Sequence, residues 1–122
     1  IEKIVIADIP GLIEGASKGR GLGIKFLRHI QRTKTLFHCI SAQSDNFMRD
    51  YKIIRKELKN YNPELAKKAE VVLLTKIDLV TPVELKIITG KLKNDFSVVI
   101  PVSIYDWEST NTLKKRIIKI GK

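Results

Sequence analysis

The sequence contains little cysteine and no long apolar run. Its single cysteine, Cys39, lies in the apolar segment LFHCI, which favours a buried, reduced thiol and a cytoplasmic location. No segment approaches the roughly 20 apolar residues that a membrane-spanning helix needs, and the N-terminus has no signal-peptide pattern. We therefore expect no transmembrane segment. A chain of 122 residues suffices for one domain with a core and is too short for two.

Acidic residues are scarce relative to basic ones. The chain has 23 Lys and Arg against 13 Asp and Glu, a formal net charge of +10. Such an excess raises non-specific affinity for nucleic acids and anionic surfaces, although lysines that only solvate helix faces explain it equally well. No glycine-flanked aromatic cluster of the kind that stacks on bases is present. The charge alone therefore names no partner.

Apolar residues are grouped in a way that predicts strands alternating with helices. Four short runs rich in β-branched residues predict buried strands. The apolar positions of three later segments recur at steps of three and four, which predicts amphipathic helices. This order predicts an α/β fold, a three-layer, mostly parallel sheet with helices on both faces. The strands are Ile4–Ala7, Leu36–Ile40, Val71–Leu74 and Val98–Val102, and the helix positions are Phe47, Tyr51, Ile54, Leu58 and Tyr61, then Leu85, Ile88 and Leu92, then Leu113, Ile117 and Ile120.

Residues with known positional preferences mark the ends of these helices. Thr81-Pro82-Val83-Glu84 predicts a helix start, with a capping box and a proline at the first helical position. Asn62-Pro63 predicts the end of the preceding helix and the start of a short further turn. Gly90 is the one unfavourable residue inside the helix that follows Thr81.

Polar residues follow three of the predicted strands, at the carboxyl ends where α/β sheets bind ligands. Asp8-Ile9-Pro10-Gly11 follows the first, Thr75-Lys76-Ile77-Asp78 the third, and Ser103-Ile104-Tyr105 the fourth. A carboxylate there can orient waters around Mg²⁺, and a glycine N–H can approach a terminal phosphate. Asp78 can accept hydrogen bonds from N1–H and the exocyclic amine of guanine, a donor pair that adenine lacks. The stem of Lys76 can lie over the base.

The glycine-rich stretch DIPGLIEGASKGRGLG, residues 8–23, resembles the signature of the Obg family of GTPases. That signature reads Asp, aliphatic, Pro, Gly, two aliphatics, acidic, Gly, Ala, two free positions, Gly, one free position, Gly. Residues 8–21 fill all fourteen places. The segments KFLRHI, LLTKIDLV and PVSIYD are also similar to the family, so the resemblance covers most of the chain. The alternative for the glycine-rich stretch is a flexible linker or a structural turn.

On the phosphate side, the resemblance implies that Asp8 binds Mg²⁺ through water. It also implies that Gly11 donates its N–H to the γ-phosphate of GTP and serves as the pivot of switch II. Leu12 stands where many small GTPases place a water-orienting Gln, which implies slow hydrolysis or a catalytic group from elsewhere. No Gly-x-x-x-x-Gly-Lys-[Ser/Thr] occurs in the sequence. We therefore expect residues 1–122 to be the second part of a G domain, inactive as an isolated chain.

On the base side, the resemblance implies that Lys76 and Asp78 hold the guanine of GTP or GDP. Ser103 and the backbone of Ile104 would contact the base from the other side. Two residues depart from the family pattern. Thr75 replaces the usual Asn, which implies weaker anchoring, and Ile104 replaces the usual Ala, which puts a bulkier side chain beside the base.

Two further groups of residues have alternative interpretations. His29 and His38 are nine residues apart on different predicted elements, which favours structural histidines over a metal site. Tyr105 and Trp107 flank the start of the last predicted helix. For these two aromatic residues, packing at the loop before the last helix is favoured over a ledge on which bases stack.

As a function, the resemblance implies a GTPase switch in assembly of the large ribosomal subunit. The partners would be guanine nucleotide and the ribosome or its RNA. The alternative is a non-enzymatic, basic RNA-binding module on a GTPase-like remnant, with Thr75 and Ile104 as signs of decay. A related family that acts on translating ribosomes shares the Asp-x-Pro-Gly signature, so the subfamily stays open. The last helix has a basic face that is either solvated or in contact with ribosomal RNA, made of Lys114, Lys115, Arg116 and Lys119.

Overall fold

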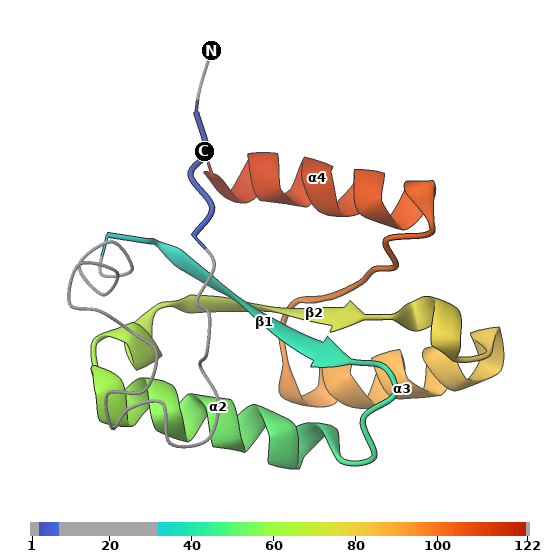
Figure 1. The fold of residues 1–122 in the computed structure, drawn as a ribbon, viewed down its shortest axis with the longest axis horizontal. Coiled ribbons are helices and arrows are strands. Elements are labelled where there is room, and N and C mark those ends of the chain that lie inside the picture. The colour runs from blue at the N-terminus through green and yellow to red at the C-terminus, as the bar shows by residue number, and fades with distance from the viewer. Residues whose placement is uncertain (1–2, 8–31, 122) are drawn as a thin grey trace. The chain divides into compact units, whose positions relative to one another are not determined.

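The computed structural model describes residues 3–7 and 32–121 (Figure 1). The elements in chain order are β1 (Thr35–Ser41), α2 (Phe47–Tyr61), η2 (Leu65–Lys67), β2 (Ala69–Thr75), η3 (Ile77–Leu79), α3 (Pro82–Asp95), β3 (Val99–Pro101) and α4 (Trp107–Gly121). The labels η2 and η3 denote short 3₁₀ helices. From β1 onward this order confirms the predicted alternation of strands and helices.

The chain divides into two compact units. One comprises Ile1–Leu36 and Met48–Ala69, and the other comprises Phe37–Phe47 and Glu70–Lys122. The second unit contains most of the sheet together with α3 and α4, whereas η2 and α2 from Met48 onward belong to the first. Within residues 3–7 and 32–121, no helix is long and apolar enough to cross a membrane.

The described strands form one sheet in the order β1-β2-β3. β2 and β3 are parallel, with Val72 opposite Val99 and Leu74 opposite Pro101. The arrow of β1 points the same way as that of β2 in Figure 1. The Val102 N–H donates to the Leu74 carbonyl oxygen at 2.8 Å, which extends the pairing beyond β3. These features confirm the predicted parallel sheet.

The core of the second unit lies on both faces of β2. Residues 71–74 of this strand are all buried, as the unbroken apolar run predicts. On one face a hydrophobic cluster joins the sheet to α4, and on the other α3 contacts β3 and buries Leu92. Figure 1 shows α3 and α4 on opposite sides of the sheet, which is the predicted layering. The cluster contains Val71, Leu73 and Ile100, with Phe37, Val98 and Leu113 packed against it.

The unit that contains α2 has a smaller apolar cluster. It is formed by Leu36, Leu58 and Leu65, with Tyr61 packed against it. Burial raises the pKa of the Tyr61 phenol above its usual value. α2 ends at Tyr61, directly before Asn62-Pro63, and η2 follows as the predicted short turn. Both helix-end predictions for this segment are therefore confirmed.

Helix α3 begins at the predicted cap. The Thr81 hydroxyl accepts a hydrogen bond from the Glu84 N–H at 3.2 Å and donates to Glu84 Oε1 at 3.0 Å, and Pro82 is the first helical residue. The helix continues through Gly90, where an added Cβ would meet no atom within 4 Å. Local capping and the apolar pattern of the helix thus outweigh the cost of about 1 kcal/mol that glycine adds to a helix interior.

The predicted strand at Ile4–Ala7 is wrong. Residues 3–7 have no regular secondary structure, and the side chains of Val5 and Ile6 are 86% and 72% exposed. A strand needs a neighbour to satisfy its backbone N–H and C=O groups, and no described strand pairs with this segment. An apolar run indicates that a segment can be buried, but it does not supply the partner that buries it.

The predicted burial of Cys39 is also wrong, because this side chain is exposed. β1 is an edge strand of the described sheet, and its burial alternates along the strand. Leu36, His38 and Ile40 are buried on one face, and Cys39 lies on the other. The second predicted histidine, His29, lies outside the described residues.

Candidate functional site

Two of the three predicted polar clusters lie in the described part of the chain, at neighbouring strand ends. Thr75 is the last residue of β2, and Lys76 to Asp78 follow it directly. Ser103-Ile104-Tyr105 begins two residues after the end of β3. Since β2 and β3 pair in parallel, both segments leave the same edge of the sheet. The third cluster, Asp8-Ile9-Pro10-Gly11, lies outside the described residues, as does Leu12.

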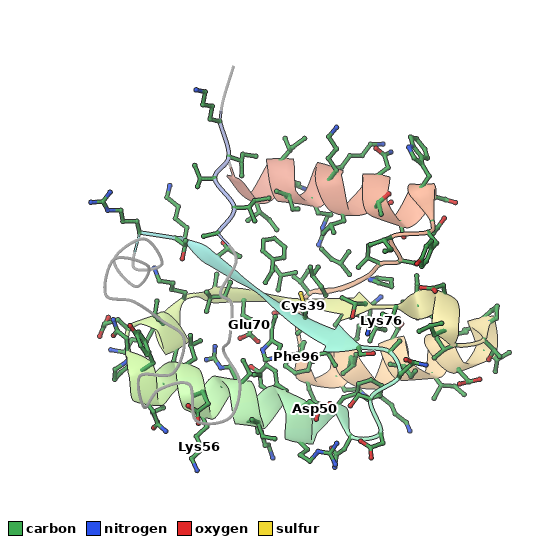
Figure 2. All side chains as sticks on the ribbon, in the orientation of Figure 1. Cys39, Asp50, Lys56, Glu70, Lys76 and Phe96 are labelled. Carbon is green, nitrogen blue, oxygen red and sulfur yellow. The ribbon has the colours of Figure 1, made fainter. Side chains whose placement is uncertain are left out.

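Lys76 has an unusual backbone conformation. With φ 57° and ψ 36° it is left-handed, and no other non-glycine residue in the described ranges has a positive φ. Its carbonyl oxygen accepts a hydrogen bond from the Leu79 N–H at 3.0 Å, which closes η3. A left-handed residue other than glycine costs about 1–2 kcal/mol and persists where the surrounding structure imposes it, often at functional loops. The side chain of Lys76 is exposed at the end of β2 (Figure 2).

The clusters after β2 and β3 meet through a hydrogen bond between side chains. The Ser103 hydroxyl donates to Asp78 Oδ1 at 2.8 Å. Ser103 is only 2% exposed, whereas Asp78 is exposed. An ionised carboxylate has about four acceptor positions on its two oxygens, so Asp78 keeps acceptors for a ligand. The arrangement presents a fixed carboxylate that can accept two parallel hydrogen bonds from a planar donor pair.

The loop after β3 presents a backbone donor at Ile104, the residue that follows Ser103. The Tyr105 N–H donates to the Ser103 hydroxyl at 3.1 Å. The N–H of Ile104, between them, donates to no other residue of the described ranges. Its side chain is 83% exposed. The loop therefore offers one unbonded N–H to an acceptor on a ligand.

Thr75 occupies the position where the family pattern has Asn. Its hydroxyl donates to the Ile40 carbonyl oxygen at 3.3 Å, and its own carbonyl oxygen accepts from the Ala42 N–H at 2.8 Å. Both bonds tie the end of β2 to β1. Thr75 therefore anchors the loop to the neighbouring strand.

The favoured interpretation of the two aromatic residues is wrong. Tyr105 and Trp107 are 82% and 77% exposed, so neither is covered by packing at the loop before α4. α4 reaches the hydrophobic cluster of the sheet through Leu113, further along the helix. The first turn of α4 therefore extends beyond the apolar contact, and aromatic residues there remain in solvent.

Ser109 in the first turns of α4 is a residue that the sequence did not single out. Its hydroxyl accepts from the Ser103 N–H at 3.0 Å and lies 3.2 Å from the Ser103 carbonyl oxygen as a donor. The spacing Asp106-x-x-Ser109 is a helix-start signal, since the Ser109 N–H donates to Asp106 Oδ2 at 3.2 Å. That signal could have placed Ser109 in the first turn, but not against Ser103.

The described residues offer both an acceptor and a donor to a ligand at the carboxyl end of the sheet. Asp78 has spare acceptor positions on its carboxylate, and Ile104 has an N–H that no described residue accepts. Within residues 3–7 and 32–121, no group of three or more His, Cys, Asp and Glu side chains could hold a metal ion. The predicted water-mediated Mg²⁺ residue, Asp8, lies outside these ranges.

Comparison with known proteins identifies the family. A family model described as "50S ribosome-binding GTPase" matches residues 1–76. The chain belongs to this family of GTPases. Curated relatives named GTPase Obg extend the match to nearly the whole chain. The chain is 46% identical over 121 residues to the protein from Rickettsia bellii, with 98% of the chain covered. It is 46% identical to the protein from Persephonella marina, again with 98% covered.

A third relative, GTPase Obg from Prochlorococcus marinus subsp. pastoris, is 53% identical over 90 residues, 74% of this chain. These relatives confirm the resemblance to the Obg family that residues 8–21 predicted. The chain spans 36% of the length of the Rickettsia bellii and Persephonella marina proteins.

Proposed function

We propose that the full-length protein is a GTPase in which residues 75–78 and 103–105 bind the guanine base. The observation that carries this proposal is the 2.8 Å hydrogen bond from Ser103 to Asp78, which holds an exposed carboxylate at the sheet edge. In this proposal Asp78 accepts from guanine N1–H and the exocyclic amine. The N–H of Ile104 donates to the carbonyl oxygen of the base, and the aliphatic stem of Lys76 covers a face of the ring. Family membership favours this proposal over a non-enzymatic remnant.

On the phosphate side, the proposal assigns the predicted roles to residues 8–11. Asp8 would act on Mg²⁺ through water, and Gly11 would donate its N–H to the γ-phosphate. Bound Mg²⁺ would neutralise charge on the phosphates. Residues 11–23 would be ordered by GTP and released after hydrolysis, as switch II. Because the aliphatic Leu12 cannot orient a water, we expect slow hydrolysis unless another group assists.

Competition binding tests the base specificity. A fluorescent GDP analogue bound to the full-length protein should be displaced by GDP and GTP, and ADP should compete at least about a hundredfold less well. The reason is that adenine leaves the charged acceptor Asp78 without donors, and each such bond contributes about 1.5–3 kcal/mol. IDP, whose base lacks the exocyclic amine, should compete less well than GDP and better than ADP. Equal competition by ADP and GDP would overturn the proposal.

We further propose that the GTPase cycle serves assembly of the large ribosomal subunit in the cytoplasm, with ribosomal RNA as a contact. Two observations support an RNA contact through α4. From Ser109 to the end of the chain there is no acidic residue. The basic face of α4 consists of exposed side chains, none of them ion-paired within the described part of the chain. Phosphate groups attract such a surface, and this attraction weakens as the salt concentration rises. This basic face is formed by Lys114, Lys115, Arg116 and Lys119.

Removal of two charges from this face should weaken binding to large ribosomal subunits. The variant Lys115→Ala/Lys119→Ala removes side chains one helical turn apart. We expect several-fold weaker binding at moderate salt. The slope of log K against log salt should fall by about one to two, one for each lost phosphate contact. The matched control is Lys86→Ala/Lys91→Ala, which removes two exposed lysines from α3. An equal loss in both variants would show that only net charge matters and would contradict a contact through α4.

A further inference from the structure

The turn that precedes α4 is held by one side chain from the helix. Both backbone polar groups of Ser103 lie against the hydroxyl of Ser109. The Ser103 N–H donates to it at 3.0 Å, and the Ser103 carbonyl oxygen is 3.2 Å from it. The Asp106 N–H also donates to the Ser103 carbonyl oxygen, at 3.1 Å. For the Ser103 N–H, however, the Ser109 hydroxyl is the one acceptor that the described residues provide.

Ser109 is itself fixed by the helix in which it lies. Its N–H donates to Asp106 Oδ2 at 3.2 Å, and its hydroxyl is within donor distance of the Asp106 carbonyl oxygen, at 3.1 Å. The Thr110 N–H donates to the same carbonyl oxygen at 3.2 Å, which begins the backbone ladder of α4. The helix runs for 15 residues and contacts the sheet through Leu113. Ser109 thus connects the turn to a rigid element.

This arrangement leaves the Ser103 hydroxyl for two other bonds. It accepts from the Tyr105 N–H at 3.1 Å and donates to Asp78 Oδ1 at 2.8 Å. A serine hydroxyl has one proton, and Ser103 donates it to the carboxylate of Asp78. The backbone N–H and carbonyl oxygen of Ser103 are bonded to Ser109 and Asp106 instead. The position of Asp78 therefore depends on Ser103, and the position of Ser103 depends on Ser109.

We propose that Ser109 is a positioning residue for the guanine site. It aligns the Asp78 carboxylate with the donor pair of the base by fixing Ser103. This inference rests on the proposed binding of guanine by Asp78. Without the Ser109 hydroxyl, the Ser103 N–H would be buried with no acceptor, because Ser103 is 2% exposed. A buried N–H without a partner is unfavourable, so the turn would shift and carry the Ser103 hydroxyl away from Asp78.

The test compares single hydroxyl deletions in the full-length protein. Ser109→Ala should raise the dissociation constant for GDP about tenfold and reduce the preference for GDP over IDP. IDP lacks the exocyclic amine, so it depends less on alignment of the carboxylate, whereas a general loss of stability would weaken both nucleotides equally. Ser109→Thr keeps the hydroxyl and should restore both values. Thr110→Ala is the matched control, because the Thr110 hydroxyl bonds the Trp107 carbonyl oxygen and no atom of the turn at Ser103.

A double-mutant cycle tests whether Ser109 acts through Ser103. If it does, Ser103→Ala/Ser109→Ala should bind GDP no more weakly than Ser103→Ala alone. A GDP-to-IDP ratio in Ser109→Ala equal to that of the wild-type protein would overturn the role of Ser109 and leave the proposed function standing. Additive effects in the cycle would do the same. Absence of GDP binding by the wild-type protein would overturn both the proposed function and this inference.

Discussion

Replacing Asp78 with asparagine in the full-length protein is expected to weaken GDP binding by about two to three orders of magnitude and to create binding of xanthosine diphosphate. Guanine presents two donors, N1–H and the amine, and the amide of asparagine offers only one acceptor beside its own donor. The variant loses one charge-assisted hydrogen bond and sets the amide N–H of asparagine against an N–H of guanine. Together these changes should reduce the binding free energy of GDP by about 3–4 kcal/mol. Xanthine has N1–H next to a carbonyl oxygen, which matches the acceptor and donor of the amide.

Competition against a fluorescent GDP analogue measures both effects. The matched control is Asp106→Asn, which removes the same charge from the neighbouring loop. Asn caps a helix as well as Asp does, so the bond from the Ser109 N–H to this side chain should survive. We expect unchanged GDP affinity in the control. The assignment of Asp78 to the base would be wrong if both variants behaved alike, or if Asp78→Asn still preferred GDP to the xanthine nucleotide.

Replacing Leu74 with alanine should destabilise the domain by about 3 kcal/mol, within the 2–5 kcal/mol typical of buried leucines. Leu74 is 0% exposed in the central strand β2, and its carbonyl oxygen accepts from the Val102 N–H at 2.8 Å. The loss comes from buried apolar surface and from the cavity that remains. Native-state hydrogen exchange of the β2 amides measures the change directly, even if further domains are present.

Leu79→Ala is the matched control for this prediction. It deletes the same atoms from a leucine that is 52% exposed in η3, so we expect a loss below about 1 kcal/mol. Equal losses in the two variants would contradict the placement of Leu74 at the centre of the core. Because only the folded fraction binds nucleotide, the Leu74 variant should also bind GDP more weakly near its unfolding midpoint.

Local patterns in the sequence predicted the strands and helices of the second unit. The unbroken apolar run Val71–Leu74 forms the buried centre of strand β2, and Thr81 caps α3. Both features depend on residues close together in the chain: an apolar run signals burial on both faces, and a cap bonds an N–H three residues away. For the same reason Asn62-Pro63 marked the end of α2 correctly.

The candidate site was predictable in its position and not in its detail. Parallel strands share a carboxyl edge, so residues 75–78 and 103–105 were expected to lie together, and the described structure brings them together through Ser103 and Asp78. The bond itself depends on the register that sets Leu74 opposite Pro101. Register is a relation between segments distant in the chain, and no local pattern states it. The role of Ser109 is hidden for the same reason.

The sequence by itself determined the family, the order of elements and the carboxylate that we assign to guanine, because each of these depends on residue types at fixed spacings. Only the tertiary structure decided which apolar residues are covered. No described strand pairs with Ile4–Ala7, Cys39 is exposed on the edge strand β1, and Trp107 lies beyond the apolar contact of α4. Burial and pairing depend on what lies across from a residue in space, and that is set by contacts between distant parts of the chain.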